Sequence, residues 1–362
     1  METQPSTATS SECRPPVISV GIIGWIRTNL LNSLFNSLLT LLILAGLCRL
    51  VPPFVKWAFL NSVWSSSAQV CKDASGACWS VVTQNLRFIL FGFYPYAEQW
   101  RPVATILLFV VLAFFSHNRR YWNKRLLYAW GGGVVLMGVI MRGGIFGLPG
   151  VETSQWGGII LTLMLSLFGL TAAYPLGVLL ALGRRSSLPV VKTLSVVYIE
   201  LMRGVPLISL LFMSSVMFPL FLPEGVTVDK ILRAQVAIIL FTAAYIAEVV
   251  RGGLQAIPKG QSEAAEALGL DYWQKMRLII LPQALKIVIP PTMSVLISAF
   301  KDTSLVIIIG LFDLMKTTKV TLSNPDWMGF STEAYIFIAL LYFGGCFSMS
   351  NFSRSLEGTL KK

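Results

Sequence analysis

The sequence has few charged residues and almost no histidine. Charged side chains make up 13% of its 362 residues, and His117 is its single histidine. It contains no G-x-x-x-x-G-K-[ST] phosphate-binding loop, so we expect that the chain does not itself supply energy through that nucleotide-binding motif. It also lacks H-E-x-x-H and G-x-S-x-G, which leaves hydrolysis without a candidate constellation. We therefore expect no catalytic residue, no metal ligand and no cofactor bound by this chain.

What the sequence does contain is apolar residues. They make up 55% of the chain and give a mean hydropathy of +0.70, beyond the range of soluble domains. Eight runs approach or exceed the ~20 apolar residues that a helix needs to cross a bilayer. The sequence therefore predicts an all-α integral membrane protein. The expected spans are roughly residues 34–60, 103–117, 126–142, 156–182, 205–222, 234–254, 284–311 and 333–352.

The net charge of +12 comes from short basic clusters between these runs, chiefly residues 119–125 and 184–192. Such clusters mark cytoplasmic loops, which makes nucleic acid a poor explanation of the charge. Placing residues 119–125 inside puts both termini in the cytoplasm. The loop at 183–204 and the segment 263–282 then also lie inside, and the loops near 61–101, 142–155, 223–233 and 312–332 lie outside.

The two ends and one loop carry further expectations. Residues 1–30 predict a flexible cytoplasmic N-terminus, and residues 1–11 lack the basic start and cleavage site of a signal peptide. Residues 357–362 form a short cytoplasmic tail. Cys71 and Cys78 flank a Ser-Gly turn in the loop placed outside, where an oxidising compartment would permit a disulfide. Their spacing alone leaves a bridge and two free thiols both open.

A short polar segment, residues 255–283, lies between the sixth and seventh expected spans. Pro258 suits the first turn of a helix that runs to Leu268, and Gly269 suits its left-handed end. Asp271, with glutamine three residues later, predicts a second helix that starts with a capping box. Pro282 predicts a break before the next apolar run.

The first of these helices has one small apolar face, formed by Ala264, Ala265 and Leu268. Glu263 and Glu266 offer hydrogen-bond acceptors at its rim. The residues by themselves fit either a knob for a cytoplasmic partner or an amphipathic loop on the lipid headgroups.

The spacing of Glu263-Ala264-Ala265, Gly269, Ile279 and Leu281-Pro282 resembles the EAA signature of the membrane subunits of ABC importers. The resemblance implies that the segment docks on a separate ATPase. It assigns this coupling to Glu263, Ala264, Ala265, Glu266, Leu268, Gly269, Leu281 and Pro282.

The resemblance also divides the chain. Residues 151–356 are similar to the membrane domain of that family, which implies a type I importer core. Residues 31–150 form an N-terminal transmembrane extension with a large external loop at about 61–101. The extension resembles that of the general L-amino-acid permease subunits, the M subunit in particular.

Charged groups within the expected spans are candidates for a translocation path, because a charge in a membrane helix tends to face a cavity or the bundle interior. Glu248 and Arg251 are three residues apart, so they fit either a structural pair or a path; the resemblance favours the path for Glu248. The family motif beginning at Lys301 fits either a gate or a buried ion pair. The candidate path residues are Glu248, Lys301, Asp302, Thr303 and Ser304.

Other motif residues favour a structural hinge. Val205 precedes Pro206 and is therefore pushed away from helical geometry, and Pro290-Pro291 removes two backbone donors within a span. The expected hinge residues are Glu200, Arg203, Gly204, Pro206, Arg251, Gly252, Pro290 and Pro291.

Together these resemblances imply the membrane subunit of an ATP-driven importer of L-amino acids in a bacterial inner membrane. The implied partners are ATP-binding subunits that use the ATP, a homologous permease subunit that forms a heterodimer rather than a homodimer, a periplasmic amino-acid-binding protein and the lipid bilayer. A stand-alone secondary carrier or channel is the alternative from physics alone. It has no need of the segment at 263–282.

Overall fold

The computed structural model describes residues 21–145 and 147–360. Within these ranges the chain is helical apart from its connections, and its β-type pairing is limited to two isolated bridges. The predicted all-α class is confirmed. The chain divides into two compact units, residues 1–78 and 79–362. The expectations for residues 1–20 and 361–362 lie outside the described residues.

In its described residues, 21–78, the first unit contains three α-helices, α1 (Gly21–Asn29), α2 (Leu34–Val55) and α3 (Ala68–Asp73). The Ser33 hydroxyl caps α2 by accepting the N–H of its third residue. A π-helical turn, Lys56–Leu60, continues α2 without interruption. The combined apolar helix has the same bounds as the first expected span.

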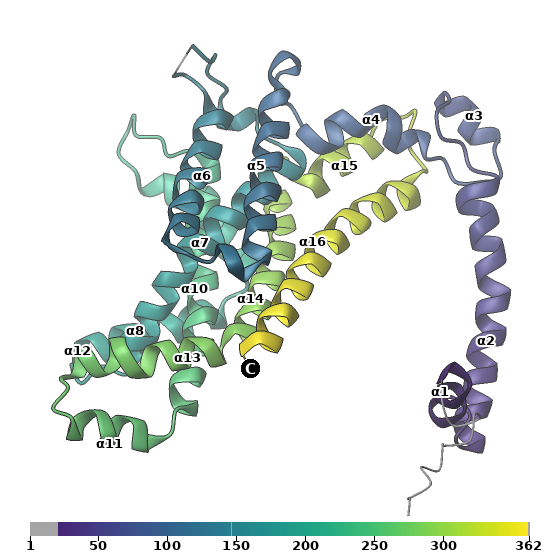
Figure 1. Ribbon diagram of the computed structural model, residues 1–362. Coiled ribbons are helices and arrows are strands. Elements are labelled where there is room, and N and C mark those ends of the chain that lie inside the picture. Colours follow the sequence, from purple (N-terminus) through teal and green to yellow (C-terminus); the bar gives the residue numbers. More distant parts are fainter. Residues whose placement is uncertain (1–20, 146, 361–362) are drawn as a thin grey trace, which may run out of the picture. The chain divides into compact units, whose positions relative to one another are not determined.

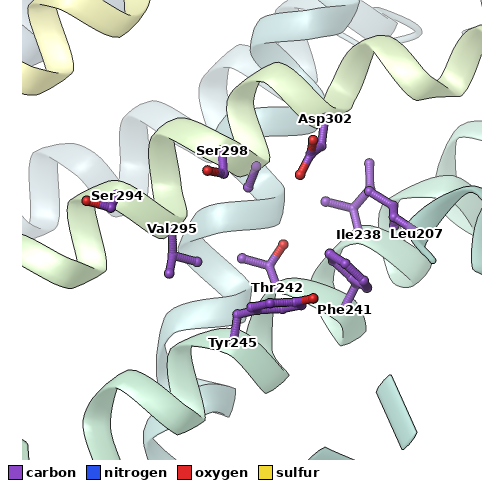
Figure 2. Close-up of a pocket in the computed structure, with 10 residues that line it drawn as sticks. Leu207, Ile238, Phe241, Thr242, Tyr245, Ser294, Val295, Ser298 and Asp302 are labelled. Carbon is purple, nitrogen blue, oxygen red and sulfur yellow. The ribbon is translucent and has the colours of Figure 1, made fainter. Parts of the chain in front are cut away.

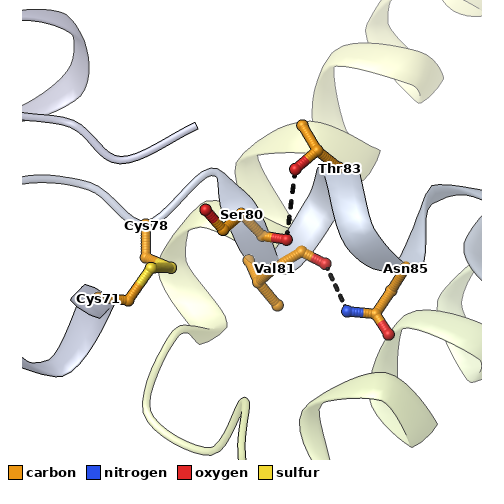
Figure 3. The surroundings of a disulfide bond; sticks show 6 residues. All are labelled: Cys71, Cys78, Ser80, Val81, Thr83 and Asn85. Carbon is orange, nitrogen blue, oxygen red and sulfur yellow. Dashed lines mark hydrogen bonds between the residues drawn. A yellow bond between two sulfur atoms is a disulfide. The ribbon is translucent and has the colours of Figure 1, made fainter. Parts of the chain in front are cut away.

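The loop after this helix is cross-linked. Cys71 and Cys78 form a disulfide with their Cα atoms 5.5 Å apart (Figure 3). The intervening turn passes so close to Asn61 that a Cβ on Gly76 would lie 2.0 Å from the Asn61 carbonyl oxygen. Glycine is therefore required at this turn, and the question that spacing left open is answered by a bridge.

The second unit begins with an amphipathic helix and two long apolar helices, α4 (Ser80–Phe91), α5 (Trp100–His117) and α6 (Lys124–Arg142). Helix α4 lies beside α15 and the start of α7 (Figure 1). The Thr317 hydroxyl of α15 donates to the Ile89 carbonyl over 3.0 Å. A Cβ on Gly158 would lie 2.2 Å from the Leu90 carbonyl oxygen, so α4 docks backbone against backbone.

Two 27-residue helices form the centre of this unit, α7 (Gly158–Arg184) and α10 (Lys230–Ala256). They pack against each other along much of their length. Small residues allow this close approach: a Cβ on Gly177 would lie 2.6 Å from a methyl group of Ile246. Residues of α7 and α10 together contribute to two buried core clusters of this unit.

Between these two helices the chain bends sharply. Helix α8 (Pro189–Gly204) is followed by α9 (Leu207–Phe212), a π turn (Met213–Met217) and a 3-10 turn (Phe218–Phe221), with a bend of 102° after α8. The prediction of a loop at 183–204 was wrong, because most of it is α8. Its polar residues interrupt the apolar run while Ile199 still packs into the core.

The remaining elements are α11 (Lys259–Ala267), α12 (Tyr272–Lys275), a π turn (Met276–Ile280), α13 (Leu281–Ile287), α14 (Ile289–Asp302), a 3-10 segment (Thr303–Ile309), α15 (Leu314–Leu322) and α16 (Ser331–Leu360). The predicted break at Pro282 was wrong. The helical path runs from Tyr272 to Ile287, since the π turn shifts the hydrogen bonds where proline has no N–H to give. The chain breaks instead at Val288, before Pro290.

Seven of the described helices are long and apolar enough to cross a membrane, and counting the bent pair as one span gives eight. The predicted number of about eight is confirmed. The loops expected outside are partly helical: residues 61–101 contain α3 and α4, and residues 312–332 contain α15.

Candidate functional site

Helices α11 and α12 form a hairpin beyond the end of α10, in which α11 lies away from the bundle of the second unit (Figure 1). We call residues 258–282 the coupling hairpin. Helix α11 ends in a Schellman motif: the Leu270 N–H donates to the Ala265 carbonyl over 3.2 Å, and the Gly269 N–H donates to Glu266 over 2.9 Å. Gly269 has φ +73°, the left-handed conformation that the sequence predicted.

The second arm of the hairpin begins with the predicted capping box. The Asp271 carboxylate accepts the Gln274 N–H at 2.7 Å, and the Gln274 side chain accepts the Asp271 N–H at 3.0 Å. Lys275 pairs with Glu266 across the turn. The turn is therefore fixed by local hydrogen bonds and by an ion pair between its two sides.

The structure separates the residues of the predicted small face. Ala265 is buried, whereas Ala264 and Glu263 are exposed and Leu268 has 77% of its surface exposed. Trp273, which the motif does not include, is 71% exposed. Both sides of the turn thus expose a large apolar side chain, which is typical of a contact surface for another protein.

The base of the hairpin is tied to the membrane bundle. Leu281 and Pro282 open α13. A Cβ on Gly253 of α10 would lie 2.2 Å from a methyl group of Val288, which follows α13. Helices α10 and α13 therefore contact each other closely, so the two arms of the coupling hairpin leave the bundle from one packed base.

An ion cluster joins three helices near that base. The Glu248 carboxylate accepts Arg251 Nε at 2.9 Å and lies 3.3 Å from Arg184 and 3.7 Å from Arg203. Arg184 also pairs with Glu200 at 2.9 Å. These side chains come from α7, α8 and α10. A substrate ammonium would have to compete with three guanidinium groups, so the geometry supports a structural role for Glu248; its role in the path stays a prediction.

A cavity of about 320 Å³ lies between α10 and α14, beside the part of α10 that precedes Glu248 (Figure 2). Its polar groups are the hydroxyls of Thr242, Tyr245, Ser294 and Ser298, together with the Asp302 carboxylate. Among the described residues that line it, Asp302 alone carries a formal charge. The cavity can therefore offer one carboxylate and several hydroxyl groups to a small polar solute.

The other residues of the motif at 301–304 do not line this cavity. Lys301 is exposed. The Thr303 hydroxyl donates to the Phe300 carbonyl over 2.7 Å, and the Ser304 hydroxyl donates to the Lys301 carbonyl over 2.8 Å. Their hydroxyls therefore bond to backbone within the same helical run, and Asp302 is the motif residue that reaches the cavity.

Sequence reasoning missed the four hydroxyl residues of the cavity. Thr242 and Tyr245 are three residues apart on α10, and Ser294 and Ser298 are four apart on α14. Polar pairs at these spacings share one face of a helix, so they were a detectable signal within otherwise apolar spans. That the two faces meet is a tertiary fact that spacing does not contain.

The predicted hinge residues fall in different settings. Gly204 and Pro206 flank the 102° bend, and Pro290 lies in the first turn of α14 with Pro291 after it. Arg251 and its neighbour Gly252 lie in the uninterrupted helix α10. At the end of α8, the Arg203 guanidinium lies 5.7 Å from the centre of the Tyr245 ring and so links the ion cluster to the cavity.

Known proteins match this chain in two ways, some over its C-terminal part and others over most of its length. The family described as "Binding-protein-dependent transport system inner membrane component" matches residues 173–362. The inner membrane amino-acid ABC transporter permease protein YhdY of Escherichia coli is 49% identical over 342 residues, covering 92% of this chain and 91% of that protein. The glutamate/glutamine/aspartate/asparagine transport system permease protein BztC of Rhodobacter capsulatus is 40% identical over 415 residues, and the match covers 96% of this chain and 95% of that protein.

A solved structure supports the fold of the core. The crystal structure of an amino acid ABC transporter with histidines is 31% identical, has a TM-score of 0.50, and covers 56% of this chain and 92% of that one. The resemblance carried by the EAA-like spacing is thus confirmed over the C-terminal part, and the two long relatives extend it to most of the chain. The chain belongs to the family of binding-protein-dependent transport system inner membrane components and is a multi-pass ABC transporter permease.

Proposed function

We propose that this permease is the membrane subunit of an ATP-driven importer of amino acids, and that the coupling hairpin transmits the work of a separate ATPase. The observation that carries the proposal is the hairpin itself. It is braced by its own hydrogen bonds, it exposes Leu268 and Trp273, and it joins the bundle through α10 and α13. The names of YhdY and BztC support amino acids as the substrate class.

The cavity between α10 and α14 is the proposed part of the translocation path in this chain. The Asp302 carboxylate suits the ammonium group that every free amino acid carries, and the hydroxyls of Thr242 and Ser298 suit hydrogen bonds to its polar groups. A charge within a membrane helix is costly, and Asp302 forms no salt bridge within the described residues, which favours its carboxylate as a substrate contact.

The ATPase acts by preferring one of two arrangements of the membrane helices. Closure of its dimer would displace α11, and the packed base at Gly253 would move α10 and α13 together. The cavity wall formed by α10 would then shift relative to α14. The chain itself supplies no ATP-binding loop, so ATP is used by the partner and no cofactor is assigned to this chain.

The remaining partners and the topology belong to the same proposal. A second, homologous permease chain would complete the path, and a periplasmic amino-acid-binding protein would deliver the substrate. The basic residues at 119–125 and the hairpin would lie in the cytoplasm with both termini. The disulfide between Cys71 and Cys78 suits the opposite, oxidising side.

The proposal is tested by measuring two properties of one variant, binding of the ATP-binding subunits and uptake of amino acids. Leu268→Glu places a charge on the exposed tip of the hairpin, so it should reduce co-purification of the ATP-binding subunits and amino-acid uptake by proteoliposomes of the assembled transporter. Met328→Glu alters a similarly exposed apolar side chain outside the hairpin and is the matched control. If Leu268→Glu left both docking and uptake at the wild-type level, the hairpin would not be the coupling site.

A further inference from the structure

A second and larger cavity lies at the end of the bundle opposite the coupling hairpin. It has a volume of about 980 Å³ and is bounded by α7, α10 and the turn that follows α6. We call it the outer groove and define it by its lining within residues 142–144, 150–172 and 227–239. It is distinct from the cavity with Asp302, with which it shares no lining residue.

The deep walls of the outer groove are apolar and straight. Helix α7 contributes Met164, Phe168 and Ala172, spaced four residues apart along one face, and α10 contributes Ile231 and Ile239. On each wall the first and last of these residues are eight positions apart, or about 12 Å along the helix axis. This depth is close to the hydrocarbon layer of one leaflet, about 15 Å for a bilayer core of about 30 Å.

The polar side chain of Gln235 lies at the base of the groove, but its amide N–H is already used in a hydrogen bond within the protein. Gln235 is buried, and its side-chain amide donates to the Leu165 carbonyl over 3.2 Å. A Cβ on Gly169 would lie 2.9 Å from that amide nitrogen, so glycine makes the space for it. The amide is held against the α7 backbone, and the surroundings of the groove remain suited to an acyl chain.

The rim is charged with both signs. Arg142 ends α6 on one side, and Glu152 and Asp229 lie on the loops before α7 and α10. Within the described residues none of the three belongs to a salt bridge. Asp229 caps α10 and accepts the Thr153 hydroxyl, yet each carboxylate oxygen can accept a further hydrogen bond.

We propose that the outer groove binds a phospholipid whose headgroup carries both a phosphate and a primary amine. The acyl chain lies along the apolar walls of α7 and α10, the phosphate meets Arg142, and the ammonium meets Glu152 and Asp229. A headgroup of both signs complements a rim of both signs. An anionic lipid without an amine would instead face two carboxylates and one arginine, which disfavours it.

The extension contributes part of the rim of the groove, the end of α6 and the turn that follows it. These residues, within 142–150, precede the region matched by the family, residues 173–362, whereas α10 lies within it. The lipid therefore bridges the extension and the transport core. Its binding is independent of the proposed function, because it requires neither the hairpin nor the cavity with Asp302.

Native mass spectrometry of the full chain tests this proposal. The chain is extracted from nanodiscs that contain equal amounts of phosphatidylethanolamine and phosphatidylglycerol, and the retained lipids are counted. The variant Glu152→Gln with Asp229→Asn removes both rim carboxylates, and asparagine still caps α10. Glu224→Gln with Asp326→Asn removes two exposed carboxylates that do not line the groove and is the matched control. Ala172→Phe places a larger side chain on the apolar wall and so narrows the groove.

The wild-type chain and the control should retain the amine lipid over the glycerol lipid by about fivefold, the factor expected for one charge contact at a membrane surface. The rim variant should lose this preference, and Ala172→Phe should reduce retention of both lipids. Equal retention of the two lipids by the wild-type chain, or an unchanged preference in the rim variant, would overturn the proposal. Displacement of the lipid by free amino acids would identify the groove as a substrate vestibule, and loss of the lipid on transporter assembly would identify it as a subunit interface; either result rejects a lipid site.

Discussion

Replacing Gly269 with valine should uncouple ATP hydrolysis from uptake. Gly269 has φ +73°, and a Cβ built there meets no atom within 4 Å, so the substitution adds no clash. The whole penalty is conformational: a left-handed backbone costs an L-residue about 1–2 kcal/mol, with β-branched residues at the upper end. Such a penalty shifts an equilibrium about 5- to 30-fold.

The strain falls on the coupling hairpin and not on the bundle, because the interactions that fix the turn are local: the Schellman bonds, the capping box and the pair of Lys275 with Glu266. The hairpin should therefore populate other turn geometries while the membrane helices stay folded. Proteoliposomes containing the assembled transporter give both rates, ATP hydrolysis and amino-acid uptake. We expect the uptake per ATP hydrolysed to fall about 5-fold or more in Gly269→Val.

Gly269→Asn is the matched control, since asparagine accepts the left-handed conformation far better than valine. It should retain most of the coupling, and Gly269→Ala should lie between the two. Wild-type coupling in Gly269→Val would refute the reasoning. An equal loss in Gly269→Asn would also refute it, because side-chain volume and not φ would then control coupling.

Three further predictions follow from buried or cross-linked groups. Burial raises the pKa of Asp313 to about 6, although hydrogen bonds from the backbone N–H groups of Lys316 and Met315 lower it in part. The protonated carboxyl therefore stabilises the folded protein fully below pH ~4, and this contribution is lost as the pH rises through 6. Asp313→Asn should remove this pH dependence, which amounts to roughly 3 kcal/mol of unfolding free energy between pH 4 and 7, measured by thermal unfolding. Glu248→Gln should lower the Tm by about 2–4 °C or more, since it leaves three arginines without their shared carboxylate. Asp302→Asn should mainly raise the KM for uptake. An unchanged Tm for Glu248→Gln would contradict its structural role and favour a role in the translocation path. Cys71→Ser should destabilise the loop at 61–78 by about 2–3 kcal/mol, measured as faster proteolysis, and equal proteolysis would show that the bridge does not hold the loop.

The features that the sequence predicted well are those set by neighbouring residues. Gly269 ends α11 because only a left-handed residue completes the Schellman bonds, and Asp271 starts α12 because its carboxylate reaches an N–H three residues away. The pair of Glu248 and Arg251 also formed as expected, since residues three apart share a helix face. Each of these depends on less than two turns of chain.

The features that the sequence did not predict depend on how helices rotate against each other. Arg184 reaches Glu248 from 64 residues away, which no local spacing encodes. Tyr245 and Ser298 line one cavity because α10 and α14 turn those faces together. Helix α8 was missed for another reason: its polar residues broke the apolar run on which span prediction relies.

Helix α10 connects the sites that matter to this transporter. Its first turns carry the rim and wall of the outer groove, its middle lines the cavity at Tyr245, and its last turns hold the ion cluster at Glu248 before the coupling hairpin begins. It is one uninterrupted helix, so a displacement at the hairpin reaches the cavity without an internal joint to absorb it. The segment that can yield lies elsewhere, at the 102° bend after α8, and the cation–π contact from Arg203 to Tyr245 spans the two. Motion of α10 must therefore either carry α8 with it through the ion cluster or break the contacts of Glu248 with Arg184 and Arg203. The strength of that cluster thus sets how far the cavity can open before α8 follows.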